Sequence, residues 1–336
     1  MLTIRDTLPD EFLYASSGSL HQLLPAPTLI HLPGRRTEPV FVAVLLHGNE
    51  DVGLKAVQTV LGQYAGRVLP RAVSLFIGNV QAAAMGVRYL EGQPDYNRIW
   101  PGTDRAGGPE HAMTAEVVEQ MRVRRVFASI DIHNNTGFNP HYGCVNSLEQ
   151  PFLHLAALFS RVVVYFKRPL GVQSAAFAKL CPSVTVECGK PGNVSGEEHA
   201  AAFIEAALHL DHFPEHPVPA HDIDLYHTVA TVKVPADVRF AFGSADADVW
   251  FEHELDRMNF RDLPAGTRLA HVAGACKKPL QAWDEEGREV AERYFEVRDG
   301  ELRTRCPITP SMLTLNETII RQDCLGYLME RLGYEP

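Results

Sequence analysis

The 336-residue sequence lacks a long apolar run, a Cys-x-x-Cys pair and any internal repeat. Since a transmembrane helix needs about 18 or more consecutive apolar residues, we expect none. Residues 1–12 carry acidic side chains where a signal peptide would carry its apolar core. The six cysteines are scattered through the chain. Their spacing favours reduced thiols and a cytoplasmic location over a disulfide framework or a Cys-rich zinc site.

Basic residues are also few. Lys and Arg total 31 against 41 Asp and Glu, which gives a formal net charge of −10. Such an acidic balance disfavours non-specific binding to phosphate backbones or anionic membranes. We therefore expect a small-molecule substrate, and neither nucleic acid nor a membrane as a partner. A homo-oligomer is compatible with the sequence, which does not fix the number of subunits.

The composition is that of a globular protein, with 46% hydrophobic and 21% charged residues. Between residues 40 and 212, apolar runs of strand type alternate with helical periodicity, which predicts an α/β domain with a largely parallel sheet. Strands are expected at Val40–Leu46, Ala72–Ile77, Val126–Ile132, Arg161–Phe166 and Ser183–Val186. Helices are expected at Val52–Leu61, Ala112–Arg122, Pro151–Phe159, Val172–Leu180 and Gly196–Leu210.

A proline-rich segment after the last of these helices indicates a domain boundary, because Pro214, Pro217 and Pro219 lie within a stretch of six residues. We therefore predict a catalytic domain over residues 1–212 and a smaller β-rich domain over residues 213–336. The second region contains short strand-like runs and a predicted final helix at Glu317–Leu332. In the first region, residues 78–108 and 134–150 are expected to be long loops, which are often functional.

Polar side chains follow three of the predicted strands at the point where each strand ends. His47 and Glu50 follow the first strand, His133 follows the third, and Glu187 follows the last. In open α/β sheets, ligands and catalytic groups gather outside the carboxyl ends of the strands. The sequence therefore predicts that these side chains meet at one edge of the sheet.

His47 and Glu50 form an H-x-x-E pair, whose spacing places both side chains on one side of a turn that opens into a helix. His133 completes a set of two histidines and one glutamate, which is typical of catalytic zinc sites with a fourth position open to water. We predict one Zn²⁺ per chain, although Co²⁺ or Mn²⁺ could occupy the same ligands. Asp131 lies two residues before His133 and could orient an imidazole from the same strand face.

The predicted loop after the second strand carries Arg88, Asn97 and Arg98 among turn-forming residues. Arginine beside a metal suits recognition of a carboxylate or stabilisation of a developing oxyanion. Cys188 follows Glu187 directly and resembles a nucleophile by position. Strand alternation turns it to the opposite face, so we interpret it as a packed core thiol.

Taken in order, these motifs resemble the succinylglutamate desuccinylase/aspartoacylase family, within the zinc carboxypeptidase-like (M14-type) superfamily. The resemblance covers roughly residues 40–212 through H-G-N-E, R-Y-L-E, N-R, D-I-H-N-N-T and V-E-C-G. It implies a mixed, largely parallel sheet with helices on both faces, followed by a smaller β-rich C-terminal domain. It also implies a zinc-dependent amidohydrolase that cleaves an N-acyl amino acid or a related N-acylated small molecule.

The resemblance assigns roles to matching positions. It makes His47, Glu50 and His133 the zinc ligands. It makes Glu187 the general base, which takes a proton from the attacking water and later protonates the leaving amine. Arg88 would polarise the scissile carbonyl, and Asn97 with Arg98 would hold the α-carboxylate of the amino-acid portion.

Two departures bear on the acyl group. Family members that take acidic acyl groups carry an arginine shortly before the catalytic glutamate, and here only Lys179 is available. Ile320 stands where aspartoacylases have a substrate-contacting tyrosine. We therefore expect a neutral acyl group such as acetyl. The alternatives are a metallocarboxypeptidase acting on short peptides and a non-catalytic relative that binds a metal or ligand.

Overall fold

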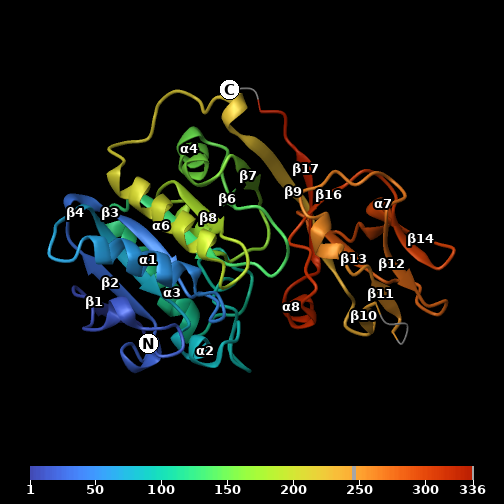
Figure 1. Cartoon of the computed structure of the whole chain (residues 1–336), viewed down its shortest axis with the longest axis horizontal. Coiled ribbons are helices and arrows are strands. Elements are labelled where there is room, and N and C mark those ends of the chain that lie inside the picture. Colours follow the sequence, from blue (N-terminus) through green and yellow to red (C-terminus); the bar gives the residue numbers. More distant parts are fainter. Residues whose placement is uncertain (244–246, 335–336) are drawn as a thin grey trace. The chain divides into compact units, whose positions relative to one another are not determined.

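The computed structural model describes residues 1–243 and 247–334, which form two compact units (Figure 1). The first unit contains residues 1–134, 141–224 and 334. The second contains residues 135–140, 225–243 and 247–333. The units part after Asp224, so the proline-rich segment lies within the first. The assignment of catalysis to residues 1–212 and of an accessory domain to residues 213–336 stays a prediction.

The first unit is built on a mixed, largely parallel sheet in the order β1-β2-β4-β3-β5-β8-β6-β7. The strands are β1 (Thr3–Arg5), β2 (Thr28–Leu32), β3 (Gly34–Val44), β4 (Leu69–Ile77), β5 (Ala128–His133), β6 (Tyr142–Val145), β7 (Val162–Tyr165) and β8 (Ser183–Glu187). Strands β4, β3, β5 and β8 run parallel to their neighbours in this group. Strand β2 is antiparallel to β4, and β6 is antiparallel to β8. The expected fold class is confirmed.

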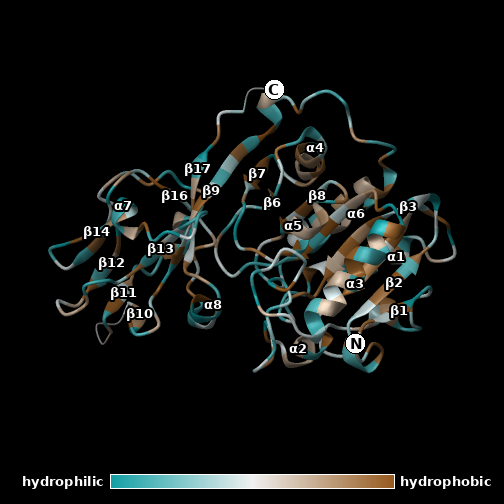
Figure 2. Ribbon diagram, turned by 180° about the vertical axis from the view of Figure 1, so that it is seen from behind, coloured by the Kyte–Doolittle hydropathy of each residue, from teal (hydrophilic) through white to brown (hydrophobic). Residues whose placement is uncertain are grey.

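Helices cover both faces of this sheet. They are α1 (Val52–Gln63), α2 (Val80–Met85), α3 (Pro109–Val123), α4 (Gln150–Phe159), α5 (Gln173–Phe177) and α6 (Val194–His209), with short 3₁₀ turns at Phe12–Tyr14 and Leu20–Gln22. On β3, Phe41 packs in a core with Val117 of α3 and Phe177 of α5. Val44 lies against Gly53 of α1 instead. Because residues 39–44 of β3 are buried on both faces, the apolar run there is continuous rather than alternating (Figure 2).

The second unit is β-rich and contains two groups of strands. In one, β17 (Gly326–Arg331) pairs with β9 (Asp224–Lys233) and β16 (Thr309–Ser311), and β13 (Gln281–Asp284) also pairs with β9. The other has the order β10 (Phe240–Phe242), β11 (Val249–Phe251), β12 (Arg268–Val272), β15 (Glu301–Thr304) and β14 (Phe295–Arg298). Short helices are α7 (Ala291–Tyr294) and α8 (Glu317–Gln322), with 3₁₀ turns at Ala220–Asp222 and Leu255–Met258. A shared apolar core lies among these elements.

The predicted final helix at Glu317–Leu332 is wrong in its second half. Helix α8 ends at Gln322, and β17 follows as an antiparallel partner of β9 and β16. A Cβ added to Gly326 would lie 2.9 Å from the Ser311 carbonyl oxygen, so this glycine permits close approach of the β16 backbone. Glycine also weakens a helix by about 1 kcal/mol relative to alanine. Strand pairing therefore outweighs the local helical pattern.

The two predicted loops contain short regular elements. Residues 78–108 include helix α2, and residues 134–150 include strand β6. None of the helices within residues 1–243 and 247–334 combines the length and the apolar character that crossing a bilayer requires.

Gly48 allows the turn after β3 to pack directly on helix α2. A Cβ at this position would lie 2.3 Å from the backbone of Ala82 and Ala83. We expect Gly48→Ala to lower the free energy of unfolding by about 1–3 kcal/mol, because the helix must shift to accept the methyl group. Urea denaturation measures this change.

Gly62→Ala is the matched control for this substitution. Gly62 lies in α1, and an added Cβ would meet no atom within 4 Å. The control should stabilise the protein by up to about 1 kcal/mol, since alanine favours a helix. Equal effects of the two substitutions would contradict the proposed packing constraint.

Candidate metal centre

Three neighbouring parallel strands deliver the predicted site residues to one edge of the sheet. His47 follows β3 by three residues, and Glu50 precedes α1. His133 is the last residue of β5, and Glu187, its register partner, is the last residue of β8. Leu45, between β3 and His47, has a φ of 54°, so the chain turns sharply before the histidine. The strand ends therefore bring these side chains to one edge, as the sequence predicts.

Glu50 lies between the two histidines. Its Oε1 is 2.8 Å from Nδ1 of His47, and its Oε2 is 2.7 Å from Nδ1 of His133. One ligand atom from each residue can be chosen so that all three lie within 4.8 Å of one another, and all three side chains are buried. Burial alone would raise the pKa of Glu50, but the adjacent His47 and His133 hold it well below its usual range. The carboxylate is therefore ionised among the imidazoles.

The donor set fits a zinc-like ion. Two imidazole nitrogens and one carboxylate form a common protein ligand set of catalytic zinc, which leaves a coordination position for water. The side chains of His47, Glu50 and His133 converge through these donor atoms, at separations that one ion can bridge with small shifts. The chemistry of the cluster thus agrees with a catalytic metal site rather than a structural site with four ligands.

Each imidazole has a carboxylate on its other nitrogen. Nε2 of His47 is 3.1 Å from Asp95 Oδ1, and Nε2 of His133 is 2.9 Å from Asp131 Oδ2. Such carboxylate partners fix the ring orientation and raise the basicity of a histidine that binds metal. Asp131 therefore lies where strand alternation predicted it. Asp95 is the member of this cluster that sequence analysis missed.

Asp95 also holds Arg88. Both Nε and Nη2 of Arg88 donate to Asp95 Oδ2, at 3.1 and 2.9 Å. Burial would raise the pKa of Asp95, but Arg88 and His47 keep this carboxyl well below its ordinary value. Nη1 of Arg88 is 3.9 Å from Glu50 Oε1, so the guanidinium lies beside the candidate ligands. One carboxylate thus positions both an imidazole and the arginine.

Asn97 and Arg98 are buried next to this group. The Asn97 side-chain amide donates to Asp131 Oδ2 at 3.3 Å and lies 3.2 Å from His133 Nε2. Its carbonyl oxygen accepts a bond from the Gln173 backbone at 2.8 Å. Nη1 of Arg98 donates to the backbone carbonyl oxygen of Asn97 at 2.8 Å. The loop that carries Arg88, Asn97 and Arg98 is therefore tied to the histidines rather than extended into solvent.

Cysteines near Glu187 show no sign of activation. Cys188 is buried, and burial raises the pKa of its thiol well above the usual value, with a further contribution from the Glu187 charge. Burial and the Glu187 charge also raise the pKa of the Cys144 thiol, which lies on β6. A thiol with a raised pKa is a poor nucleophile, which supports the interpretation of Cys188 as a core residue.

A sequence model of the succinylglutamate desuccinylase/aspartoacylase catalytic domain matches residues 37–212. The chain belongs to the succinylglutamate desuccinylase/aspartoacylase family. This family consists of hydrolases that remove acyl groups from N-acyl amino acids. Among curated proteins, no sequence matches the chain.

Solved structures of low sequence identity share the fold of this family member. Succinylglutamate desuccinylase from Chromobacterium violaceum is 18% identical, with a TM-score of 0.57 over 90% of this chain and 87% of that one. Murine aminoacylase 3 is 15% identical, with a TM-score of 0.59 over 89% and 96%. A succinylglutamate desuccinylase/aspartoacylase from Rhodobacter sphaeroides is 14% identical, with a TM-score of 0.58 over 91% and 89%.

After incubation with Zn²⁺, variants of this desuccinylase/aspartoacylase family member with alanine at His47, Glu50 or His133 should retain sharply less metal than the parent protein. Each substitution removes one of three metal-binding side chains, and the two that remain would bind the ion weakly. Metal analysis after dialysis measures the change, with His221→Ala, an exposed position, as the control. Normal zinc content in any of the three variants would remove that residue from the ligand set.

Asp95→Asn should lower zinc affinity by about 10–100-fold, because the amide no longer carries the charge that orients His47. Competition with a chromogenic chelator measures this affinity. Asp104→Asn is the control, because Asp104 is exposed and its substitution removes the same single negative charge as Asp95→Asn. Equal affinities of the Asp95 variant and the parent protein would contradict the positioning role of Asp95.

Proposed function

We propose that this family member is a zinc-dependent amidohydrolase that cleaves the amide bond of an N-acyl amino acid with an activated water. The observation that carries the proposal is the buried His47, Glu50 and His133 cluster, with Glu187 at the end of the neighbouring strand. The family supplies the substrate class, and these residues supply the chemistry. The scattered cysteines and the acidic charge support a cytoplasmic enzyme with a small-molecule substrate.

His47, Glu50 and His133 would hold the zinc. When bound, zinc acts as a Lewis acid that makes water nucleophilic near neutral pH. Asp95 and Asp131 keep both imidazoles oriented with Nδ1 toward Glu50. The backbone N–H of Asn134 also donates to Glu50 Oε2 at 3.2 Å. These contacts fix the donor atoms before a metal or substrate arrives, which reduces the reorganisation needed for binding.

Glu187 would act as the general base. It would accept a proton from the attacking water and return it to the leaving amine nitrogen when the amide bond breaks. The side chain is buried, and its position opposite His133 in the parallel register brings it to the edge of the sheet that carries the metal ligands. A positioned carboxylate of this kind contributes roughly 100- to 10,000-fold to such reactions.

Arg88 would stabilise the negative charge that develops on the carbonyl oxygen. Asp95 holds the guanidinium by two hydrogen bonds, so its direction is set in advance. A preorganised donor of this kind contributes about 2.7–4 kcal/mol, because it acts mainly on the transition state. Arg98, with Asn97, would bind the α-carboxylate of the amino acid. The bonds from Asn97 to Asp131 and from Gln173 to Asn97 hold this pair against the histidines.

We propose that the acyl group is neutral, such as acetyl, and that it is released as its carboxylic acid once the amine has left. The stretch before Glu187 contains no arginine, and its one lysine, Lys179, is exposed. A buried cation is what an acidic acyl group needs to compensate for its desolvation. The absence of an arginine from residues 173–186 therefore favours acetyl over succinyl or aspartyl substrates.

Glu187→Gln should retain zinc and lose roughly 100- to 10,000-fold in turnover, because glutamine cannot accept the proton. The assay is amine release by the zinc-loaded protein from N-acetyl, N-succinyl and N-aspartyl-type amino acids and from short peptides. Full activity of the variant would refute the assignment of Glu187 as the general base. Release from peptides alone would assign a metallocarboxypeptidase, and zinc binding with no release from any substrate would favour a binding protein.

A further inference from the structure

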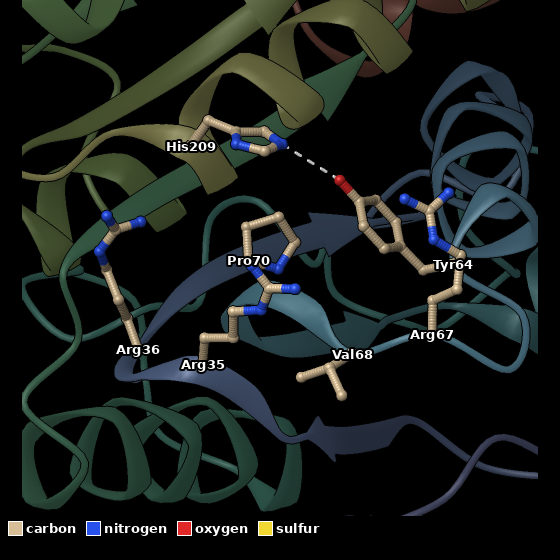
Figure 3. Close-up of a pocket in the computed structure, with 7 residues that line it drawn as sticks. All are labelled: Arg35, Arg36, Tyr64, Arg67, Val68, Pro70 and His209. Atoms are coloured by element: carbon tan, nitrogen blue, oxygen red, sulfur yellow. Dashed lines mark hydrogen bonds between the residues drawn. The ribbon is translucent and has the colours of Figure 1, made fainter.

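A hollow of about 590 Å³ lies in the first unit, away from the metal ligands. Figure 3 shows three arginines and an aromatic ring around it. The lining residues are Arg35, Arg36, Tyr64, Arg67, Val68, Pro70 and His209. They come from the start of β3, the connection from α1 to β4, the second residue of β4 and the last residue of α6.

The hollow is at the opposite edge of the sheet from the candidate metal centre. Arg35 and Arg36 stand at the amino end of β3, and His47 follows the carboxyl end of the same strand. A strand rises about 3.3 Å per residue, so the two edges are on the order of 30 Å apart. The amidohydrolase chemistry proposed above therefore does not use these arginines.

Positive charge is concentrated here although the chain carries a net charge of −10. Arg36 forms an ion pair with Asp211. Within the part of the chain that the structure describes, Arg35 and Arg67 have no carboxylate partner. Arg67 donates to the Gln63 carbonyl at 3.4 Å, and its guanidinium lies 5.4 Å from the Tyr64 ring centroid. Two cations thus remain available to an anion that enters the hollow.

Tyr64 and His209 form a fixed wall. The Tyr64 hydroxyl donates to Glu205 Oε1 at 2.5 Å, and His209 Nε2 lies 3.0 Å from the same oxygen. Glu205 itself does not line the hollow. Burial and Glu205 raise the pKa of Tyr64, while Arg67 and Arg35 lower it, which reflects how near both guanidinium groups lie to the ring. With Val68 and Pro70, the ring gives the hollow an apolar side beside its cationic one.

We propose that this hollow binds a small organic molecule with two linked phosphoryl groups, of the nucleoside diphosphate class. Guanidinium forks match phosphoryl oxygens in geometry as well as charge. The volume is in the range of pockets for small organic ligands and exceeds what a single inorganic ion needs. The Tyr64 ring and Val68 would receive the flat, less polar part of the ligand.

Calorimetric titration of the zinc-loaded full chain with ADP in 0.15 M salt tests the proposal. We expect saturable binding with Kd below about 1 mM. Pyrophosphate should bind and adenosine should not, because the phosphoryl groups carry the recognition. Absence of ADP binding would overturn the proposal, and citrate binding as tightly as pyrophosphate would overturn the choice of phosphoryl over carboxylate groups.

Substitutions locate the binding. Arg35→Gln and Arg67→Gln should each weaken ADP binding by at least about tenfold, since each removes a guanidinium from the ligand. Arg105→Gln is the matched control, because Arg105 is exposed and lies outside the hollow. Circular dichroism would verify that the Arg35→Gln, Arg67→Gln and Arg105→Gln variants keep the fold of the parent protein. Binding that is undiminished in both arginine variants would place ADP elsewhere, for example on the bound zinc, and would overturn the site.

Discussion

The contact of one buried carboxylate with two imidazoles determines how the rest of the first unit is arranged. Glu50 must reach Nδ1 of both His47, which follows β3, and His133, which ends β5. That contact requires β3 and β5 to be adjacent and parallel, so that both chains leave the sheet at the same edge. Burying the Glu50 carboxylate costs free energy, because an isolated ionised carboxylate is strongly destabilised away from water. The imidazoles offset this cost without a metal, and a divalent cation would offset it further.

Two further carboxylates, those of Asp95 and Asp131, fix the orientation of the two imidazole rings. Asp95 and Asp131 take the far nitrogen of each ring, and Arg88 neutralises part of the resulting charge through Asp95. The network alternates carboxylates with nitrogen donors, so Glu50, Asp95 and Asp131 each have a side-chain nitrogen of His133 or Arg88 within 2.9 Å. Removing one member leaves its partner buried and uncompensated, which typically costs more than the pair itself contributes. The network therefore resists substitution even where a residue would never touch the substrate.

The sequence predicts those parts of this arrangement that depend on local hydrophobic pattern and on the order of the strands along the chain. Val40–Leu46 and Val126–Ile132 are recognisable as buried strands, and polar residues at their ends indicate a shared edge. Asp95 is different, because it lies in a loop whose path depends on Trp100 and Gly171 packing rather than on periodicity. Strand β17 was missed for a related reason. Its pairing with β9, about 100 residues earlier, outweighs a local helical pattern.

The same strand, β3, carries cations at one end and candidate metal ligands at the other, and charge screening explains why the two can coexist. At physiological ionic strength, exposed charges are largely screened beyond about 8 Å. The arginines around the hollow stand several times farther than this from Glu50, so they would neither repel a bound cation nor lower its affinity. Had Arg35 or Arg36 followed the carboxyl end of β3, its charge would compete directly with the metal for Glu50. A single sheet can thus hold a cation site at one edge and an anion site at the other, with little interaction between them.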